Sequence, residues 1–328
     1  MFKNMSKVSI IGAGNVGATA AMKLASKNVV DNIVLLDIKE GIAEGKAMDI
    51  MQCSVYDNFK TDVSGVTNDY SKTAGSDVIV ITSGVPRKPG MSREDLVGIN
   101  SSIMKSVVEG CDKYSPNALY VVVSNPMDTM TYQVVKILKS MHPELVTSPY
   151  CKRVIGMGGM LDSSRFRYYV YKALNEKGMN VEINAISGYV EGAHSDKNMV
   201  PVKESVTVNE NGHPWKGSEL LSKDEFDKVV EDTMKGGATL TGLLGTSAWE
   251  APGACIAELV RALISGDPNF GAPCSIYDES SDVAIGMFIT VSTEGVRDVY
   301  LPVGDEVITK FTEAVKAVKA VNEALPKE

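Results

Sequence analysis

The sequence predicts an α/β protein, in which a doubly wound parallel sheet is followed by a second, α+β domain. Three observations indicate this fold. Short β-branched runs alternate with helical stretches up to about residue 150, which is typical of βαβ units. The runs "VIVIT" and "YVVVS" are continuously apolar, as are strands buried on both faces of a parallel sheet. Beyond Pro149 the pattern changes to alternating strands between longer helices.

In the first half, strands are expected at "KVSIIG", "NIVLLD", "DVIVIT" and "ALYVVVSN", with helices between them. The second half contains "RVIGMG", a long helix, strands at "EINAISGYV" and "VPVKESVTV", two helices, and strands at "DVAIGMFITV" and "VRDVYLPV". A length of 328 residues favours about two domains, here 1–150 and 151–328.

A final helix is expected from Asp305 to about Leu325. Its apolar residues recur near helical spacing, so we expect this face to pack on the core. The predicted core positions are Ile308, Phe311, Val315, Val318 and Leu325.

The composition limits the possible partners and compartments. A formal net charge of -8 argues against a nucleic-acid surface, which needs clustered Lys and Arg. The five cysteines form no CxxC pair, so reduced and mostly buried thiols are expected, without a metal site. Only seven residues precede "VSIIG", and no segment is apolar enough to span a membrane. We therefore expect a cytoplasmic protein.

The first strand leads into a glycine-rich turn. "VSIIGAGNVG" contains Gly12, Gly14 and Gly17 as a GxGxxG motif between a strand and a helix. Glycines at this point permit a tight turn and let a pyrophosphate approach the N–H groups of a helix N-terminus. The motif predicts a Rossmann-type dinucleotide site, with a purely structural turn as the alternative. The predicted cofactor loop also includes Ala13, Asn15 and Val16.

Asp37 ends the second strand, twenty positions after Gly17. A carboxylate here accepts hydrogen bonds from an adenosine ribose and repels a 2′-phosphate, so NAD is favoured over NADP. An ordinary turn-starting Asp is the alternative. A nicotinamide cofactor implies hydride transfer, which for an alcohol and carbonyl pair also needs a group that exchanges a proton.

Among the three histidines, His194 is the candidate for that proton transfer. His142 and His213 each precede a proline in loop-like segments and are interpreted as surface residues. His194 follows an apolar strand among small residues, and a neutral imidazole can accept the proton of a substrate hydroxyl. A structural histidine is the alternative, and the dinucleotide motif favours the catalytic interpretation.

These segments resemble the lactate and malate dehydrogenase family, and within it the malate dehydrogenases of the lactate-dehydrogenase-like type. The resemblance covers essentially the whole chain. It rests on "GAGNVG", "LLD", "PRKPGMSRxDL", "VSNPMD", "GMGGMLDSSRFR" and the His194 segment, in the family's order. It implies NAD-dependent oxidation of (S)-malate to oxaloacetate, a step of the tricarboxylic acid cycle, by a homo-oligomer that is a tetramer or a dimer.

The resemblance also implies roles for individual residues. His194 would be the general acid/base, Asp162 the carboxylate that orients its imidazole, and Arg165 the clamp on the C1 carboxylate of the substrate. A helix-surface salt bridge is the alternative for Arg165. The further implied cofactor contacts are Asn100, Val123, Ser124 and Asn125, the last of which also binds substrate.

The segment "GVPRKPGMSRED" is similar to the family's mobile loop, which closes over cofactor and substrate. Arg93 is implied to polarise the substrate carbonyl, and Arg87 to pair with the second carboxylate of oxaloacetate. Lactate dehydrogenases carry Gln where this chain has Arg87. Breaking a buried ion pair costs about 3 to 5 kcal/mol, so Arg87 favours oxaloacetate over pyruvate.

Some positions depart from the family pattern. Ala193 and Ser195 flank His194 where glycines are more usual, and Glu250 stands where related malate enzymes carry an aromatic residue. A carboxylate facing the pocket would oppose binding of a dianion. Two other functions remain open. A lactate or other 2-hydroxy acid dehydrogenase would prefer pyruvate, and a silent NAD-binding sensor would turn over neither substrate.

Overall fold

The computed structural model describes residues 6–86, 92–145, 151–210 and 212–326, without the side chains of Arg93 and Leu145. Its strands are β1 (Lys7–Ile11), β2 (Asn32–Asp37), β3 (Asp62–Thr67), β4 (Val78–Ile81), β5 (Leu119–Val122), β6 (Val154–Gly156), β7 (Ile186–Gly192), β8 (Met199–Glu210), β9 (His213–Lys216), β10 (Gly271–Asp278), β11 (Val283–Ser292) and β12 (Gly295–Tyr300). Its helices are α1 (Asn15–Ser26), α2 (Ile42–Asp57), α3 (Arg93–Asp112), α4 (Met127–Met141), α5 (Gly159–Glu176), α6 (Gly217–Leu220), α7 (Lys223–Leu244), α8 (Glu250–Ser265) and α9 (Asp305–Asn322). The predicted α/β class is confirmed.

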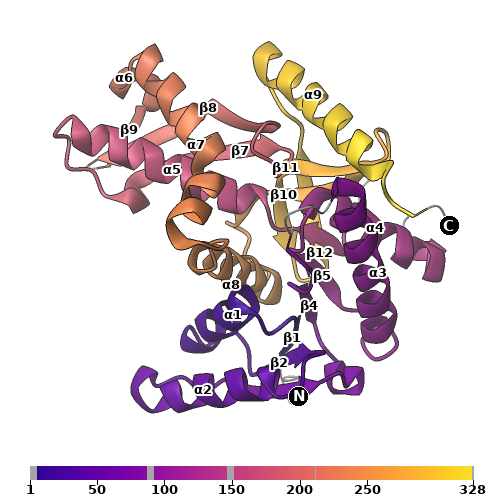
Figure 1. The fold of residues 1–328 in the computed structure, drawn as a ribbon. Helices are drawn as coiled ribbons and strands as arrows, with labels where there is room; N and C mark the ends of the chain where they lie inside the picture. Colours follow the sequence, from indigo (N-terminus) through magenta and orange to yellow (C-terminus); the bar gives the residue numbers. More distant parts are fainter. Residues whose placement is uncertain (1–5, 87–91, 146–150, 211, 327–328) are drawn as a thin grey trace.

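The first half forms a parallel sheet in the order β3-β2-β1-β4-β5-β6. Successive residues of β4 point into different cores, Val78 and Val80 into one and Ile79 and Ile81 into the other. Because both faces are buried, the strand reads as a continuous apolar run. Helices α1 and α8 lie on one side of these strands, and α3 and α4 lie on the other (Figure 1).

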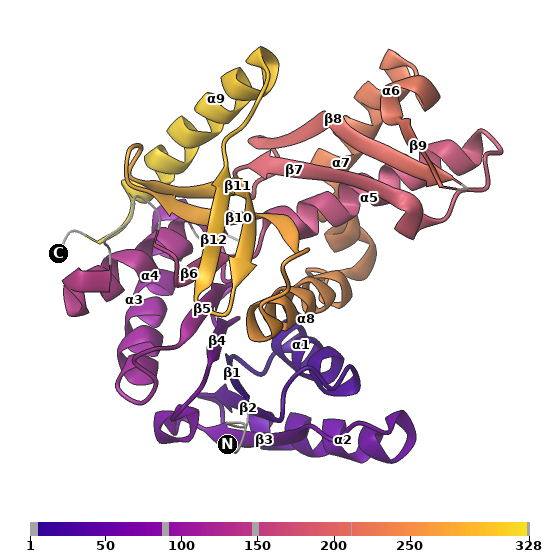
Figure 2. The ribbon, with the colours of Figure 1, turned by 180° about the vertical axis from the view of Figure 1, so that it is seen from behind.

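The second half joins the same sheet through antiparallel strands. β6 pairs with β10, and the order continues β11-β7-β8-β9, with β12 on β11. The hairpin of β7 and β8 extends away from β10 and β11 and is covered by α5 and α7 (Figure 2). The parallel sheet thus takes its sixth strand from beyond residue 150, and the two-domain division at that residue stays a prediction.

Helix α8 brings the second half of the chain against the first half. It packs on α1, and a β-carbon at Gly253 would lie 2.5 Å from the Thr19 methyl carbon. A residue larger than glycine would therefore separate the two helices. This close crossing holds the end of α7 and the start of α8 beside the glycine-rich turn.

Three strands and one core position differ from the sequence-based expectation. β3, β9 and β10 are missing from the prediction, since β3 contains Gly65, β9 is a short exposed strand and β10 is interrupted by Pro273. Gly65 fits because a β-carbon there would overlap the Ala43 carbonyl of α2. On α9, Val318 is buried, but the prediction for Ile308 is wrong because its side chain is 48% exposed.

Glu191 of β7 is a buried carboxyl that gives stability a pH dependence. It is 4% exposed, and its Oε1 accepts a hydrogen bond from the Phe288 N–H at 3.3 Å. Burial raises the pKa of Glu191 to about 7, with the Phe288 hydrogen bond opposing the shift. The folded protein binds the Glu191 proton more tightly than the unfolded chain does. The contribution of this proton to the free energy of unfolding is therefore fully present below the pKa of Glu191 in the unfolded chain, and it is lost as the pH rises towards and through 7.

Replacing Glu191 with Gln should remove this pH dependence. We expect the free energy of unfolding of the variant, relative to wild type, to increase by about 2 to 3 kcal/mol between pH 5 and pH 8. Urea unfolding at both pH values measures this change. The exposed Glu204→Gln serves as the control on the neighbouring strand. A difference between variant and wild type that stays constant with pH would contradict the prediction.

Candidate active site

The glycine-rich turn between β1 and α1 is shaped for close approach of a ligand. Gly12 has a φ of +107°, and a β-carbon there would lie 2.7 Å from the Ser83 nitrogen. A β-carbon at Gly17 would overlap the Gly12 carbonyl oxygen, whereas one at Gly14 would have nothing within 4 Å. Gly14 caps α1 without a side-chain hydrogen bond. First-turn N–H groups of such a helix suit an anion such as a pyrophosphate.

Asp37 lies at the carboxyl end of β2, beside this turn. Its Oδ2 accepts a hydrogen bond from the Ala13 N–H at 2.8 Å, and its Oδ1 accepts one from the Lys39 N–H at 3.0 Å. The carboxylate therefore braces the glycine-rich turn. Each carboxylate oxygen can accept a further hydrogen bond, as ribose binding would require. Its cofactor role stays a prediction.

Asn100 of α3 connects two loops at the same edge of the sheet. Its side-chain amide donates to the Asn125 carbonyl at 2.7 Å, and its Oδ1 accepts from the Val85 N–H at 2.9 Å. It is 1% exposed. Asn100 therefore holds the segment after β4 against the segment after β5, a structural role that the helical pattern alone did not indicate.

His194, Asp162 and Arg165 form one hydrogen-bonded cluster. His194 follows β7, whereas Asp162 and Arg165 lie three residues apart on α5. Asp162 Oδ2 is 2.7 Å from His194 Nδ1, and Asp162 Oδ1 accepts a hydrogen bond from an Arg165 terminal nitrogen at 2.9 Å. With Nδ1 donating to Asp162, Nε2 is the ring nitrogen left for a substrate. Gly158 makes room, because a β-carbon there would lie 2.8 Å from the imidazole Cγ.

The surroundings favour the protonated form of His194. Burial lowers the pKa of His194, but the charge and hydrogen bond of Asp162, together with the charge of Asp128, outweigh burial. Arg165 opposes them weakly. The net result is a pKa above the usual value for histidine. A raised pKa lets the imidazolium persist near neutral pH, where it can donate a proton.

These side chains line a cavity of about 710 Å³. Helix α7 lines it too, with Gly237 and Thr241, and a β-carbon at Gly237 would lie 3.4 Å from an Arg165 terminal nitrogen. The cavity brings together, among the predicted site residues, Val16, Asn100, Val123, Ser124, Asn125, Asp162, Arg165 and His194. Residues far apart in the sequence thus meet at one concave site, as binding of a cofactor and a small substrate requires.

Some predicted site residues lie elsewhere or outside the described residues. Arg87 is outside them, and Arg93 begins α3 with its side chain not described. Glu250 is not among the described residues that line the cavity: its side chain is 73% exposed and lies 3.6 Å from Lys23 Nζ. Its carboxylate therefore does not face the cavity that contains Arg165.

Sequence reasoning missed several residues of the site. Thr82 Oγ1 donates to the Gly12 carbonyl at 2.9 Å and so supports the glycine-rich turn. Gly236 and Gly237 let α7 approach Arg165. The sequence could have indicated this close approach, because a glycine pair is disfavoured within a helix unless the packing requires it. Asp128 accepts the main-chain N–H of His194 at 2.7 Å. An acidic residue in the first turn of a helix is too common to signal such a contact.

Three further observations concern the described ranges only. No group of His, Cys, Asp or Glu side chains there has an arrangement that could hold a metal ion. None of the helices in these ranges combines the length and the apolar character needed to cross a bilayer. All five cysteines are free thiols, and only Cys53 is not fully buried.

Almost the whole chain is similar in sequence to known proteins. Residues 6–146 match the family described as lactate/malate dehydrogenase, NAD binding domain. A malate dehydrogenase of Flavobacterium johnsoniae is 50% identical over 324 residues, which cover 97% of this chain and 98% of that protein.

Solved structures share the fold. The apo form of the malate dehydrogenase from Picrophilus torridus is 37% identical with a TM-score of 0.86, and the match covers 97% of each chain. A lactate dehydrogenase from Cryptosporidium parvum, complexed with lactic acid and nicotinamide adenine dinucleotide, is 29% identical with a TM-score of 0.84, covering 98% of each chain. The fold is thus common to enzymes for both substrates. By sequence identity over almost its full length, this chain belongs to the lactate/malate dehydrogenase family.

Proposed function

We propose that this chain is an NAD-dependent malate dehydrogenase, which catalyses the reversible oxidation of (S)-malate to oxaloacetate. The observation that carries the proposal is the cluster of His194, Asp162 and Arg165 in a cavity also lined by Val16 of the glycine-rich turn. A base, a carboxylate that orients it and a guanidinium are the groups that oxidation of a 2-hydroxy acid needs. Several relatives that are 49 to 50% identical to this chain are malate dehydrogenases, which supports malate rather than lactate as the substrate of this chain.

NAD is the cofactor, and the residues present fit it. The open side of Gly14 and the uncapped start of α1 suit the pyrophosphate, and Asp37 suits the adenosine ribose. Asn100, Ser124 and Asn125 would contact the nicotinamide half. When bound, NAD would supply the hydride acceptor for the oxidation of malate at C2, and NADH would supply the hydride donor for the reverse reaction.

The chain's own residues would handle the proton and the substrate. His194 Nε2 accepts the proton of the C2 hydroxyl as malate is oxidised and donates it back as oxaloacetate is reduced. Asp162 fixes the tautomer and stabilises the imidazolium. Arg165 pairs with the C1 carboxylate, and its buried Nε has no partner among the described residues.

Three further roles complete the proposed site. Asn125 would hydrogen-bond the substrate from the carboxyl end of β5. Arg93 would polarise the carbonyl oxygen as negative charge develops on it, and Arg87 would pair with the distal carboxylate. The side chains of both arginines lie outside the described residues.

NADH absorbance with oxaloacetate or pyruvate at equal concentrations tests the proposed function. We expect kcat/KM to be at least about a hundredfold higher for oxaloacetate, since pyruvate would leave a buried cation unpaired. Fluorescence titration with NADH shows in parallel that the cofactor site is intact. Preference for pyruvate would indicate a lactate-type enzyme, and NADH binding without turnover of either substrate would indicate a sensor.

Replacing Arg165 with Lys should weaken recognition of the C1 carboxylate. Lysine keeps the charge but loses the planar fork that binds a carboxylate through two hydrogen bonds. We expect kcat/KM for oxaloacetate to fall about a hundredfold, mostly through KM. Arg167→Lys is the matched control on α5, because Arg167 Nε donates to the Gly188 carbonyl instead. Equal effects of the two substitutions would contradict the assignment.

The chain is proposed to act as a homo-oligomer, either a tetramer or a dimer. Large apolar side chains are exposed on two helices: Met48, Val55 and Tyr56 on α2, and Leu243 and Leu244 on α7. Exposed apolar patches of this kind often mark subunit interfaces. Sedimentation equilibrium distinguishes the two states. We also propose a cytoplasmic location, a step in the tricarboxylic acid cycle, and no nucleic-acid or membrane partner.

A further inference from the structure

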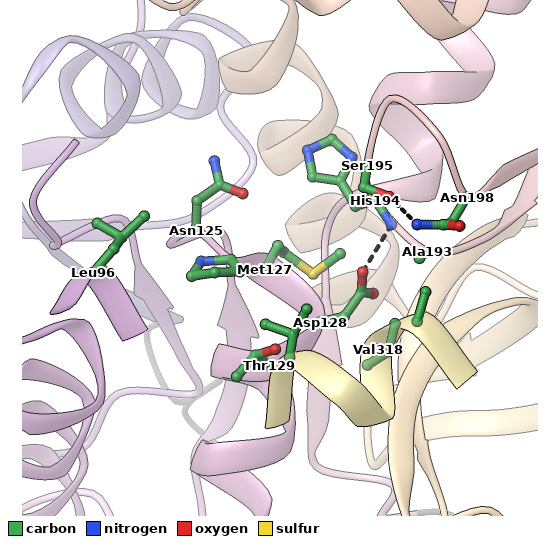
Figure 3. A pocket seen from close by; sticks show the side chains of 13 residues that line it. Leu96, Asn125, Met127, Asp128, Thr129, Ala193, His194, Ser195, Asn198 and Val318 are labelled. Carbon is green, nitrogen blue, oxygen red and sulfur yellow. Dashed lines mark hydrogen bonds between the residues drawn. The ribbon is translucent and has the colours of Figure 1, made fainter. Parts of the chain in front are cut away.

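A second buried carboxylate lies beside His194, on the main-chain side. Asp128 is the second residue of α4, and its Oδ2 accepts a hydrogen bond from the His194 main-chain N–H at 2.7 Å (Figure 3). Asp128 is 5% exposed and Asp162 is 1% exposed. His194 is therefore bonded to two buried carboxylates, one at its ring and one at its main chain.

This hydrogen bond joins two segments that are far apart in the sequence. Asp128 and His194 are 66 positions apart, so this hydrogen bond joins the start of α4 to the turn after β7. The other oxygen of Asp128, Oδ1, is buried as well. An apolar side chain would avoid the cost of burying that oxygen. A purely structural anchor would not need a negative charge.

Asp128 also borders a smaller cavity, of about 280 Å³, between α4 and α9. His194, Asn125 and Ser195 line it as well, and Figure 3 shows Asp128 among these side chains. The carboxylate and the imidazole thus share one partly polar space, in which charges interact more strongly than they do in bulk water.

Few other charges face His194 in the described residues. Those that act on its protonation are Asp128 of α4, and Asp162 and Arg165 of α5. Glu191 of β7 is bonded instead to the main chain of β11. Burial raises the pKa of Asp128 to about 6, while a hydrogen bond from Ser275 and the charge of His194 oppose this rise. A protonated His194 thus stabilises the carboxylate form of Asp128.

We propose that Asp128 is a positioning residue for the proton transfer: it anchors the main chain of His194, and its charge favours the protonated imidazole. This inference rests on the acid/base role of His194 proposed above. Reduction of oxaloacetate needs the imidazolium, so the second carboxylate extends the pH range of the reduction to higher pH. Asp162 alone would orient the ring, but it would provide only part of this electrostatic support.

The substitution Asp128→Asn separates the charge from the hydrogen bond, because the amide oxygen can still accept the His194 N–H. The chain has three histidines, so ¹⁵N-histidine NMR of the full-length protein can follow the titration of His194 directly. We expect its midpoint to fall by about half a unit to one unit. In the pH–rate profile of oxaloacetate reduction, the limb on which the rate falls should move to lower pH by the same amount. The rate at the low-pH plateau should change little.

Asp128→Ala removes the anchor as well, and we expect its plateau rate to fall about tenfold further. Asp112→Asn is the matched control, since Asp112 is also buried and bonded to a histidine, His142, away from the cavity that contains Arg165. It should leave the His194 titration unchanged.

An unmoved His194 titration in Asp128→Asn would overturn the role of the charge. Equal plateau rates in the Asn and Ala variants would overturn the anchor. A shifted titration with an unshifted pH–rate profile would instead contradict the acid/base role of His194, and with it the proposed function.

Discussion

Replacing Asp162 with Asn lowers kcat for oxaloacetate reduction by about 10³- to 10⁴-fold, as expected for a carboxylate that orients a catalytic imidazole. In wild type, Asp162 Oδ2 lies 2.7 Å from His194 Nδ1. An asparagine can turn its NH₂ group towards the ring, which favours the tautomer with the proton on Nε2. That tautomer cannot accept the proton of the malate hydroxyl, so oxidation of malate is impaired as well.

The same substitution changes the pH profile in a defined direction. In the proposed mechanism the reductive direction uses the imidazolium of His194, so we expect its rate to fall as the pH rises through the pKa of His194. Asp162 is the largest of the influences that raise this pKa. Its removal should therefore move the falling limb to lower pH. Initial rates from pH 5.5 to 9 measure both effects.

NADH binding serves as the control for the Asp162 variant, since Asp162 contacts His194 and Arg165 rather than the glycine-rich turn. A normal NADH affinity with a large loss of kcat supports the orienting role. A loss below about tenfold, with the pH profile unchanged, would show that His194 does not depend on Asp162.

The parts of the site that sequence predicts best are local. GxGxxG lies within one strand–turn–helix unit, so its spacing alone predicts a turn shaped like that of Gly12 to Gly17. Asp162 and Arg165 lie three residues apart on a helix, and their contact follows from helical geometry. The parallel sheet was predicted for the same reason, because each buried strand carries its own apolar run.

Contacts between distant segments could not be predicted from spacing. His194 and Asp162 are 32 positions apart, and only the family resemblance implied that they pair. Asp128 belongs to the "VSNPMD" motif, but its contact with His194 could not be predicted, because its partner is a main-chain N–H and therefore leaves no mark on the residue type at position 194. Glu250 is the opposite case: the sequence marked it as a residue that could face the pocket, but its side chain pairs with Lys23 of α1 away from the cavity.

Replacing Arg87 with Gln should reduce discrimination between oxaloacetate and pyruvate by about two to four decades. Oxaloacetate carries two carboxylates, and Arg165 is the one guanidinium among the described residues that line the cavity. The distal carboxylate needs a second cation, and Arg87 in the loop before α3 is the candidate. Loss of one partner of a buried ion pair costs about 3 to 5 kcal/mol, which corresponds to this range.

The kinetic pattern separates recognition by Arg87 from loop closure. If Arg87 pairs with the distal carboxylate, Arg87→Gln lowers kcat/KM for oxaloacetate and not for pyruvate, which has no such group. If the loop acts only by closing, both substrates lose activity alike. Lys88→Gln on the same loop controls for the change in net charge and should leave the preference intact. Selective loss with oxaloacetate would therefore assign the choice of substrate to Arg87, because Arg165 is proposed to bind the carboxylate that both keto acids share.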